Sequence, residues 1–140
     1  PLTLKNSYII STPILKEHSQ TDVTISLKNM LGSTLGGKAK VARKGRFHRL
    51  GIDECIVDVN LYLRPNLAVV DGIVAGVGGE LGARPKKLGI MIFSEDLVAA
   101  DAVGAKYLGY QPLHVRHLKL AQEKGLGIVD LDRVEIVETI

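Results

Sequence analysis

Two carboxylates stand in apolar surroundings that cannot solvate them, and they are the first candidates for chemistry. Asp71 lies inside the apolar run at residues 67–74, and Asp101 lies in a helix-forming stretch of small apolar residues. An ionised carboxylate in such surroundings must be paired, bound to a metal or raised in pKa. We therefore predict Asp71 as a general base or metal ligand and Asp101 as a second catalytic carboxylate. The alternatives are that Asp71 accepts hydrogen bonds from nearby amides and that Asp101 lies at the surface.

Glycines follow Asp71 closely and could bring backbone amides up to a ligand. The four that we place in a candidate ligand-binding site are Gly72, Gly76, Gly78 and Gly79. Their spacing is not that of a dinucleotide-binding loop, because the third glycine of that pattern is missing and residues 83–85 lead into a strand instead of a helix. The alternative interpretation is a plain connection between two strands.

Further polar side chains complete the candidate site. We predict that Lys28 takes part in catalysis as the partner of a substrate anion. Four more residues are predicted to bind the ligand: Lys16, His18, Asn29 and His48. The first two of these follow a short strand, where open α/β sheets place their ligands. A bound metal would take His18 and Asp71, whereas the alternative for each histidine is an ordinary surface or hydrogen-bonded residue.

The first elements of the chain follow from its apolar spacing. A strand is predicted at residues 7–12, followed by a helix that Thr21 or Asp22 caps and Gly32 ends. The buried stripe of that helix is Val23, Leu27, Met30 and Leu31. Because Lys28 and the residue after it lie off this stripe, both should face solvent or a cleft.

The rest of the chain alternates helices with apolar strands. Helices are predicted at residues 51–64, 97–108 and 112–125, and strands at residues 67–74, 88–93 and 133–138. The connection between the strands at 67–74 and 88–93 is too short for a crossover helix, so they should be antiparallel or distant in the sheet. The predicted fold is one α/β domain over residues 1–140, with a mixed sheet of about four strands flanked by about four helices.

Composition excludes several classes of protein. The 140 residues carry a net charge of +3, yet residues 38–49 hold six of the 18 basic side chains and no acid, which leaves 12 basic and 15 acidic residues elsewhere. Such a local basic segment is typical of a loop that closes over an anion or stays solvated, and nucleic-acid binding through it ranks last. No apolar run reaches the roughly 20 residues of a membrane-spanning helix. With Cys55 as the only cysteine, we expect a cytoplasmic protein without disulfides and without an iron–sulfur cluster on this chain.

Six segments resemble, in chain order, the motifs of a family catalogued as domain of unknown function 362: residues 16–18, 23–29, 48–53, 63–72, 96–103 and 118–127. The resemblance implies that this chain corresponds to the later, C-terminal portion of a longer family domain. It also implies an association with iron–sulfur proteins, whose cluster would belong to another segment or a partner. The family has no settled reaction. The residues that its motifs emphasise are also the ones chosen above on physical grounds: Lys16, His18, Lys28, Asn29, His48, Asp71 and Asp101.

Three functions follow from these observations. The first is a site at one end of the sheet that binds a small anionic molecule or a metal and could serve an enzyme linked to redox metabolism. The second is a binding or accessory module, without chemistry of its own, for an iron–sulfur partner. The third is nucleic-acid binding through residues 38–49.

Overall fold

A computed structural model describes residues 2–34, 45–79 and 81–139. Five strands form one mixed sheet: β1 (Ile10–Ser11), β2 (Ile14–His18), β3 (Asp22–Thr24), β4 (Leu67–Val77) and β5 (Arg84–Ser94). The α-helices are α1 (Leu2–Lys5), α2 (Ser26–Asn29), α3 (Gly45–Leu50), α4 (Ile52–Leu63), α5 (Leu97–Leu108) and α6 (Arg116–Glu123). Short 3₁₀ turns are η1 (Met30–Ser33), η2 (Pro112–His114) and η3 (Leu131–Arg133). The predicted α/β class with a mixed sheet is confirmed.

Strand β4 is the centre of the sheet. Both β1 and β2 run parallel to β4 along one side of it, and β5 runs antiparallel along the other side. Strand β3 is the outer neighbour of β2 and is antiparallel to it. The predicted pairing of the two apolar strands at 67–74 and 88–93 is therefore confirmed as antiparallel.

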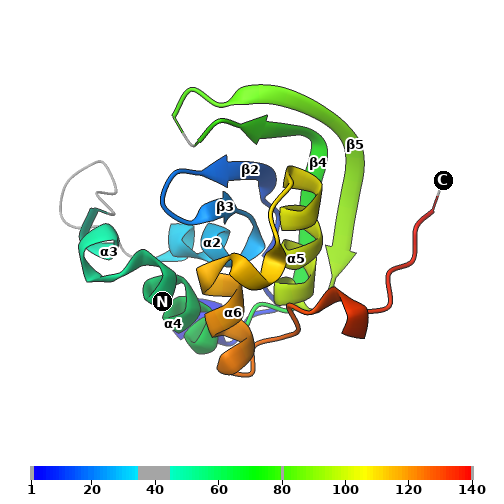
Figure 1. The fold of residues 1–140 in the computed structure, drawn as a ribbon. Coiled ribbons are helices and arrows are strands. Elements are labelled where there is room, and N and C mark those ends of the chain that lie inside the picture. The colour runs from blue at the N-terminus through cyan, green and yellow to red at the C-terminus, as the bar shows by residue number, and fades with distance from the viewer. Residues whose placement is uncertain (1, 35–44, 80, 140) are drawn as a thin grey trace.

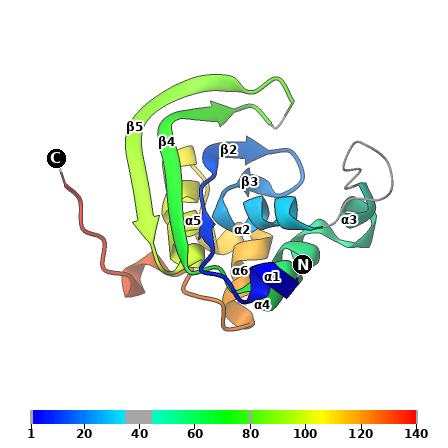
Figure 2. The ribbon, with the colours of Figure 1, turned by 180° about the vertical axis from the view of Figure 1, so that it is seen from behind.

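The β4–β5 hairpin is long and bends over β2 (Figures 1 and 2). The bend coincides with a shift in register between Gly72 and Val74, where β5 contains one more residue than β4. Gly89, at this point of β5, has φ of +70°, a conformation that other residues adopt only with strain. The hairpin carries the run of glycines that the sequence suggested was a loop: Gly72 and Gly76 lie within β4, and Gly78 and Gly79 lie at its turn.

The core lies between the sheet and the helices on its inner face (Figure 1). Helix α5 packs against β4 and β5, and its small residues allow a close approach. A side-chain carbon on Gly104 would come within 2.9 Å of both Leu15 and Ile25. Asp96 caps α5 by accepting from the Ala99 N–H at 2.9 Å, and Gly109 ends the helix in the left-handed conformation.

Four predicted elements were wrong in type or extent. The predicted strand at 7–12 is reduced to β1, and a second strand, β2, begins directly after Pro13, so Lys16 and His18 lie within a strand and not after one. Residues 22–24 form β3, and the predicted helix shrinks to α2 and η1, although its apolar stripe is buried. The predicted helix at 112–125 is divided into η2 and α6. Residues 134–139 form no strand, since they pair with none of the described strands.

Of the basic segment at 38–49, residues 38–44 lie outside the described residues. Residues 45–49 belong to α3, so this part of the segment is helical and not a loop.

Candidate functional site

A cavity of about 230 Å³ opens where β3, α2 and α3 meet. The residues that line it are Thr24, Lys28, Asn29, Leu31, Gly32, Phe47, His48 and Ile52. Three of them, Lys28, Asn29 and His48, are residues that the sequence placed in the site. None of the described lining residues is acidic, and each polar side chain among them has at least one hydrogen-bond donor.

Thr24 is the lining residue that sequence reasoning missed. Its neighbours Val23 and Ile25 are fully buried, so the alternation of the strand turns Thr24 to the cavity side. The Thr24 hydroxyl oxygen is buried and has no hydrogen-bond partner among the described residues. An unsatisfied buried hydroxyl costs about 1–3 kcal/mol, and an acceptor bound in the cavity would remove this cost. The signal in the sequence was the single polar residue between two β-branched apolar ones.

Two histidines meet beside the cavity, of which His48 lines it. The rings of His18 and His48 are stacked, with centroids 6.1 Å apart and planes 11° apart. The backbone N–H of Gln20 donates to Nδ1 of His18 at 3.1 Å, while the side-chain oxygen of Gln20 contacts Nδ1 of His48. Gln20, which the sequence did not single out, thus links β2 to α3, and it fixes the ring nitrogen on which a neutral His18 carries its proton, Nε2.

Lys16 lies beside this group. It stands opposite Thr24 on β3 and opposite Gly76 on β4. A side-chain carbon on Gly76 would lie 3.3 Å from Cβ of Lys16, so the glycine leaves room for the lysine side chain on this face of the sheet. The role of Gly76 that follows from the structure is therefore steric.

The side chain of Asn29 is held by a hydrogen bond to Ser11 of β1. Its side-chain amide donates to the hydroxyl of Ser11 at 3.2 Å, and the Ser11 hydroxyl donates to the carbonyl of Ser26 at 2.9 Å. This chain of hydrogen bonds ties α2 to β1 and fixes the direction in which the helix carries Lys28.

Asp71 lies outside the cavity lining. It stands on β4 between Ile14 of β2 and Met91 of β5, and its carboxylate accepts from the backbone N–H of Ile73 at 3.0 Å. This matches the alternative in which Asp71 serves nearby amides. At the turn of the hairpin, the N–H of Gly78 donates to the carboxylate of Glu17 at 2.5 Å, so this amide already has an acceptor.

Asp101 is fully buried and caps α2 from another helix. Its two carboxylate oxygens accept from the backbone N–H groups of Ser26 at 2.8 Å and Leu27 at 2.9 Å, and the Ser26 hydroxyl also contacts it. Burial raises the pKa of Asp101 to about 6, and the bonds from Ser26 and Leu27 and the nearby His117 act in the opposite direction. Asp101 thus orients the helix that carries Lys28 and does not line the cavity.

A second buried polar group lies between α4 and α6. His117 is fully buried, its Nδ1 lies 3.4 Å from a carboxylate oxygen of Asp53, and neither ring nitrogen makes a hydrogen bond to a described residue. Nearby, Arg116 contacts Glu54 at the surface. A backbone hydrogen bond, and after it the contact with Arg116, lowers the pKa of Glu54. These contacts join α6 to the first turn of α4.

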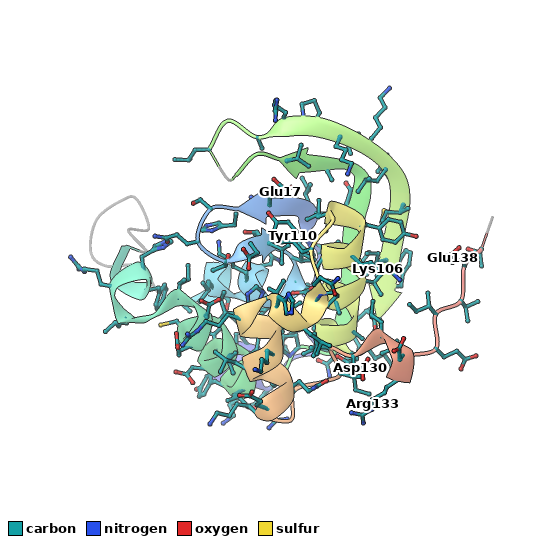
Figure 3. All side chains as sticks on the ribbon, viewed as in Figure 1. Glu17, Lys106, Tyr110, Asp130, Arg133 and Glu138 are labelled. Atoms are coloured by element: carbon teal, nitrogen blue, oxygen red, sulfur yellow. The ribbon has the colours of Figure 1, made fainter. Side chains whose placement is uncertain are left out.

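A larger cavity, of about 370 Å³, lies at the end of α5. Lys106, Tyr110 and Asp130 are among its lining residues and are labelled in Figure 3. Burial, followed by the charges of Glu17 and Asp22, raises the pKa of Tyr110. The lining mixes a lysine with two aspartates, so it shows no preference for a ligand of one charge.

The structure gives no support for a metal at His18 and Asp71. Within residues 2–34, 45–79 and 81–139, no three side chains of the ligating types His, Cys, Asp and Glu are grouped to hold a metal ion.

Burial and the charges of Asp58 and Glu54 raise the pKa of Cys55, which packs against the core. Cys55 therefore serves as a small apolar residue and not as an activated thiol.

Comparison with known proteins gave three findings. The model of a family described as "Domain of unknown function (DUF362)" matches residues 2–106. The chain is 30% identical over 124 residues to the "Thylakoid-associated protein sll1697" of Synechocystis sp., an alignment that covers 85% of this chain and 38% of the relative. No solved structure matches.

None of the described helices has the length and apolar character that crossing a bilayer requires, and the cytoplasmic location stays a prediction.

Proposed function

The chain belongs to the DUF362 family, and we propose that the cavity between β3, α2 and α3 binds a small anionic ligand through carboxylate or phosphate oxygens. The observation that carries this proposal is a lining with donors and no acid among its described residues, in which the buried Thr24 hydroxyl has no partner. An anion supplies acceptors and no donors, so it complements such a lining.

Two lysines near the cavity favour the same charge. Lys28 lines the cavity and Lys16 lies next to Thr24 in the sheet, while His48 adds a polar ring to the lining. Charge-assisted hydrogen bonds are roughly twice as strong as neutral ones, and a partly enclosed site screens them less than open solvent does. The ligand is small, because a cavity of about 230 Å³ is below the size range of drug-sized ligand pockets.

Catalysis remains a separate prediction. Asp71 and Asp101 lie outside the lining of this cavity, and no described carboxylate stands within it to act as a base. The cavity geometry therefore supports binding, and the predicted catalytic roles of Asp71, Lys28 and Asp101 require a substrate to be tested. The predicted iron–sulfur partner likewise stays a prediction.

Titration with inorganic phosphate and with malonate, followed by calorimetry and by NMR, tests the proposal. Thr24→Val should weaken binding while leaving the melting temperature equal or higher, because it removes a buried hydroxyl without a partner. Lys28→Gln should weaken phosphate binding about tenfold, the scale of one charge-assisted hydrogen bond. Lys119→Gln, on the exposed face of α6, is the matched control and should bind as the parent does.

Unchanged affinity in both Thr24→Val and Lys28→Gln would overturn the proposal. So would an equal loss in Lys119→Gln, since that result would mean that phosphate responds only to the net charge of the protein.

A further inference from the structure

Strand β5 has a free edge. Among the described residues it pairs with β4 alone, along all of Arg84–Ser94, so its other side presents unpaired N–H and C=O groups. Figure 1 shows β5 at the margin of the sheet, with η3 and the C-terminal segment lying beyond the end of the strand. Such an edge is a template for pairing with another chain, and natural proteins protect it when it has to stay unpaired.

The two halves of this edge are protected differently. Before the bulge at Gly89 the strand carries Arg84, Pro85, Lys86 and Lys87, which are the residue types that discourage pairing. After it, residues 90–94 form a regular segment with no charge and no proline. Protection of one half alone indicates that the second half meets a partner.

The unprotected half is also apolar on its outer face. Phe93 is 65% exposed and Met91 42% exposed, whereas Ile90 and Ile92 pack inward on the core. Met91 pairs with Asp71 on β4, and Asp71 pairs with Ile14 on β2, which is 58% exposed. The row that contains Met91 and the exposed Phe93 side chain therefore both end at the edge where the strand is unpaired.

The charges at the two ends of β5 favour a second copy of this chain. The strand begins with basic residues, and the exposed Glu95 follows its last residue. Two parallel copies would set like charges together, but two antiparallel copies set Lys87 of one beside the partner's Glu95. Such a contact is isologous and closes with two-fold symmetry.

We propose that the chain forms a homodimer in which β5 pairs antiparallel with the partner's β5, in the register that places Met91 beside the partner's Met91. In this register Ile90 faces the partner's Ile92, and Phe93 covers the partner's Gly89, which has no heavy atom within 4 Å of its missing side-chain position. An aromatic side chain across from an edge glycine stabilises a sheet. The two five-stranded sheets become one sheet.

Charge exchange at the strand ends tests this arrangement. In sedimentation equilibrium over about a hundredfold range of concentration, the parent should form a closed dimer. Lys87→Glu and Glu95→Lys should each weaken dimerisation about tenfold, because each sets like charges opposite each other twice in the dimer. The double variant should restore parental dimerisation. Both substitutions are at exposed positions, and circular dichroism should show unchanged folding.

Phe93→Lys is a second test that does not depend on the ion pairs. It should give a folded monomer with the circular dichroism spectrum of the parent, since Phe93 is exposed on the single chain. A monomeric parent would overturn the proposal. Growth beyond the dimer would also overturn it, as would a double variant that dimerises no better than either single variant.

Discussion

Asp101→Asn is the sharpest test of the buried carboxylate that caps α2. Because burial raises its pKa from 3.8 to about 6, the folded chain binds a proton at Asp101 more tightly than the unfolded chain does. The contribution of Asp101 to stability is therefore greatest below pH 4, falls as the pH rises from about 4 to about 6, and is constant above that range. A shift of about two pKa units corresponds to about 3 kcal/mol.

Asparagine cannot titrate, so the variant lacks this dependence. It also keeps only one acceptor for the two N–H groups of Ser26 and Leu27, and the loss of one bond to such an acceptor costs about 1.5–3 kcal/mol. Relative to the parent, Asp101→Asn should thus be most destabilised near pH 4 and least destabilised near pH 7. The difference between the free energies of unfolding should change by about 3 kcal/mol between these limits.

Urea denaturation followed by circular dichroism, in steps between pH 4 and pH 7.5, measures this difference directly. Asp58→Asn, on the exposed side of α4, is the control and should follow the parent at every pH. The reasoning is refuted if the Asn variant is destabilised most at neutral pH, because that result means that the hydrogen bonds from Ser26 and Leu27 outweigh burial and hold the carboxyl ionised.

Three further substitutions test other parts of the structure. Gly127→Ala should cost about 1–2 kcal/mol in urea denaturation, because its new carbon would lie 2.0 Å from the Asp96 oxygen that caps α5; after Asp96→Ala the same change should cost less. His117→Leu should move the pH-dependent loss of stability to higher pH, since His117 lowers the pKa of Asp101; an unchanged midpoint contradicts this. Asp71→Asn should change stability by less than about 1 kcal/mol and leave phosphate binding unchanged, because Asn keeps the acceptor for Ile73 and lies outside the cavity; weaker phosphate binding would return Asp71 to the site.

Periodicity predicted the long elements well. Helix α4, helix α5 and the antiparallel pair β4–β5 all have at least 11 residues, with capping residues or apolar runs that mark them. The short elements at residues 14–29 were missed because their stability does not come from local sequence. Helix α2 has four residues and no side-chain cap of its own, and Asp101, 75 positions away from Ser26, supplies the acceptor that it lacks. A window of sequence does not contain that contact.

The candidate site was predicted in part. Lys28, Asn29 and His48 come together at one cavity, and His18 joins them through the stacked rings. The grouping of Asp71 with these residues is not seen, because β4 carries it to the far side of a register shift from Gly76. Spacing along the chain identifies residue types that suit chemistry, but the pairing of strands decides which of them meet.

The topology of β4 also sets an order for assembly. Pairing β4 with β5 joins Val77 to Arg84, 7 positions apart in the sequence, whereas pairing it with β1 joins Ile10 to Leu67, 57 positions apart. The longer closure costs about 2 kcal/mol more in chain entropy. We therefore expect the hairpin to form first, since its closure costs less chain entropy, and the N-terminal strands to pair with β4 afterwards. The contacts that complete the cavity form in this later, non-local step, so the binding surface is created after most of the sheet.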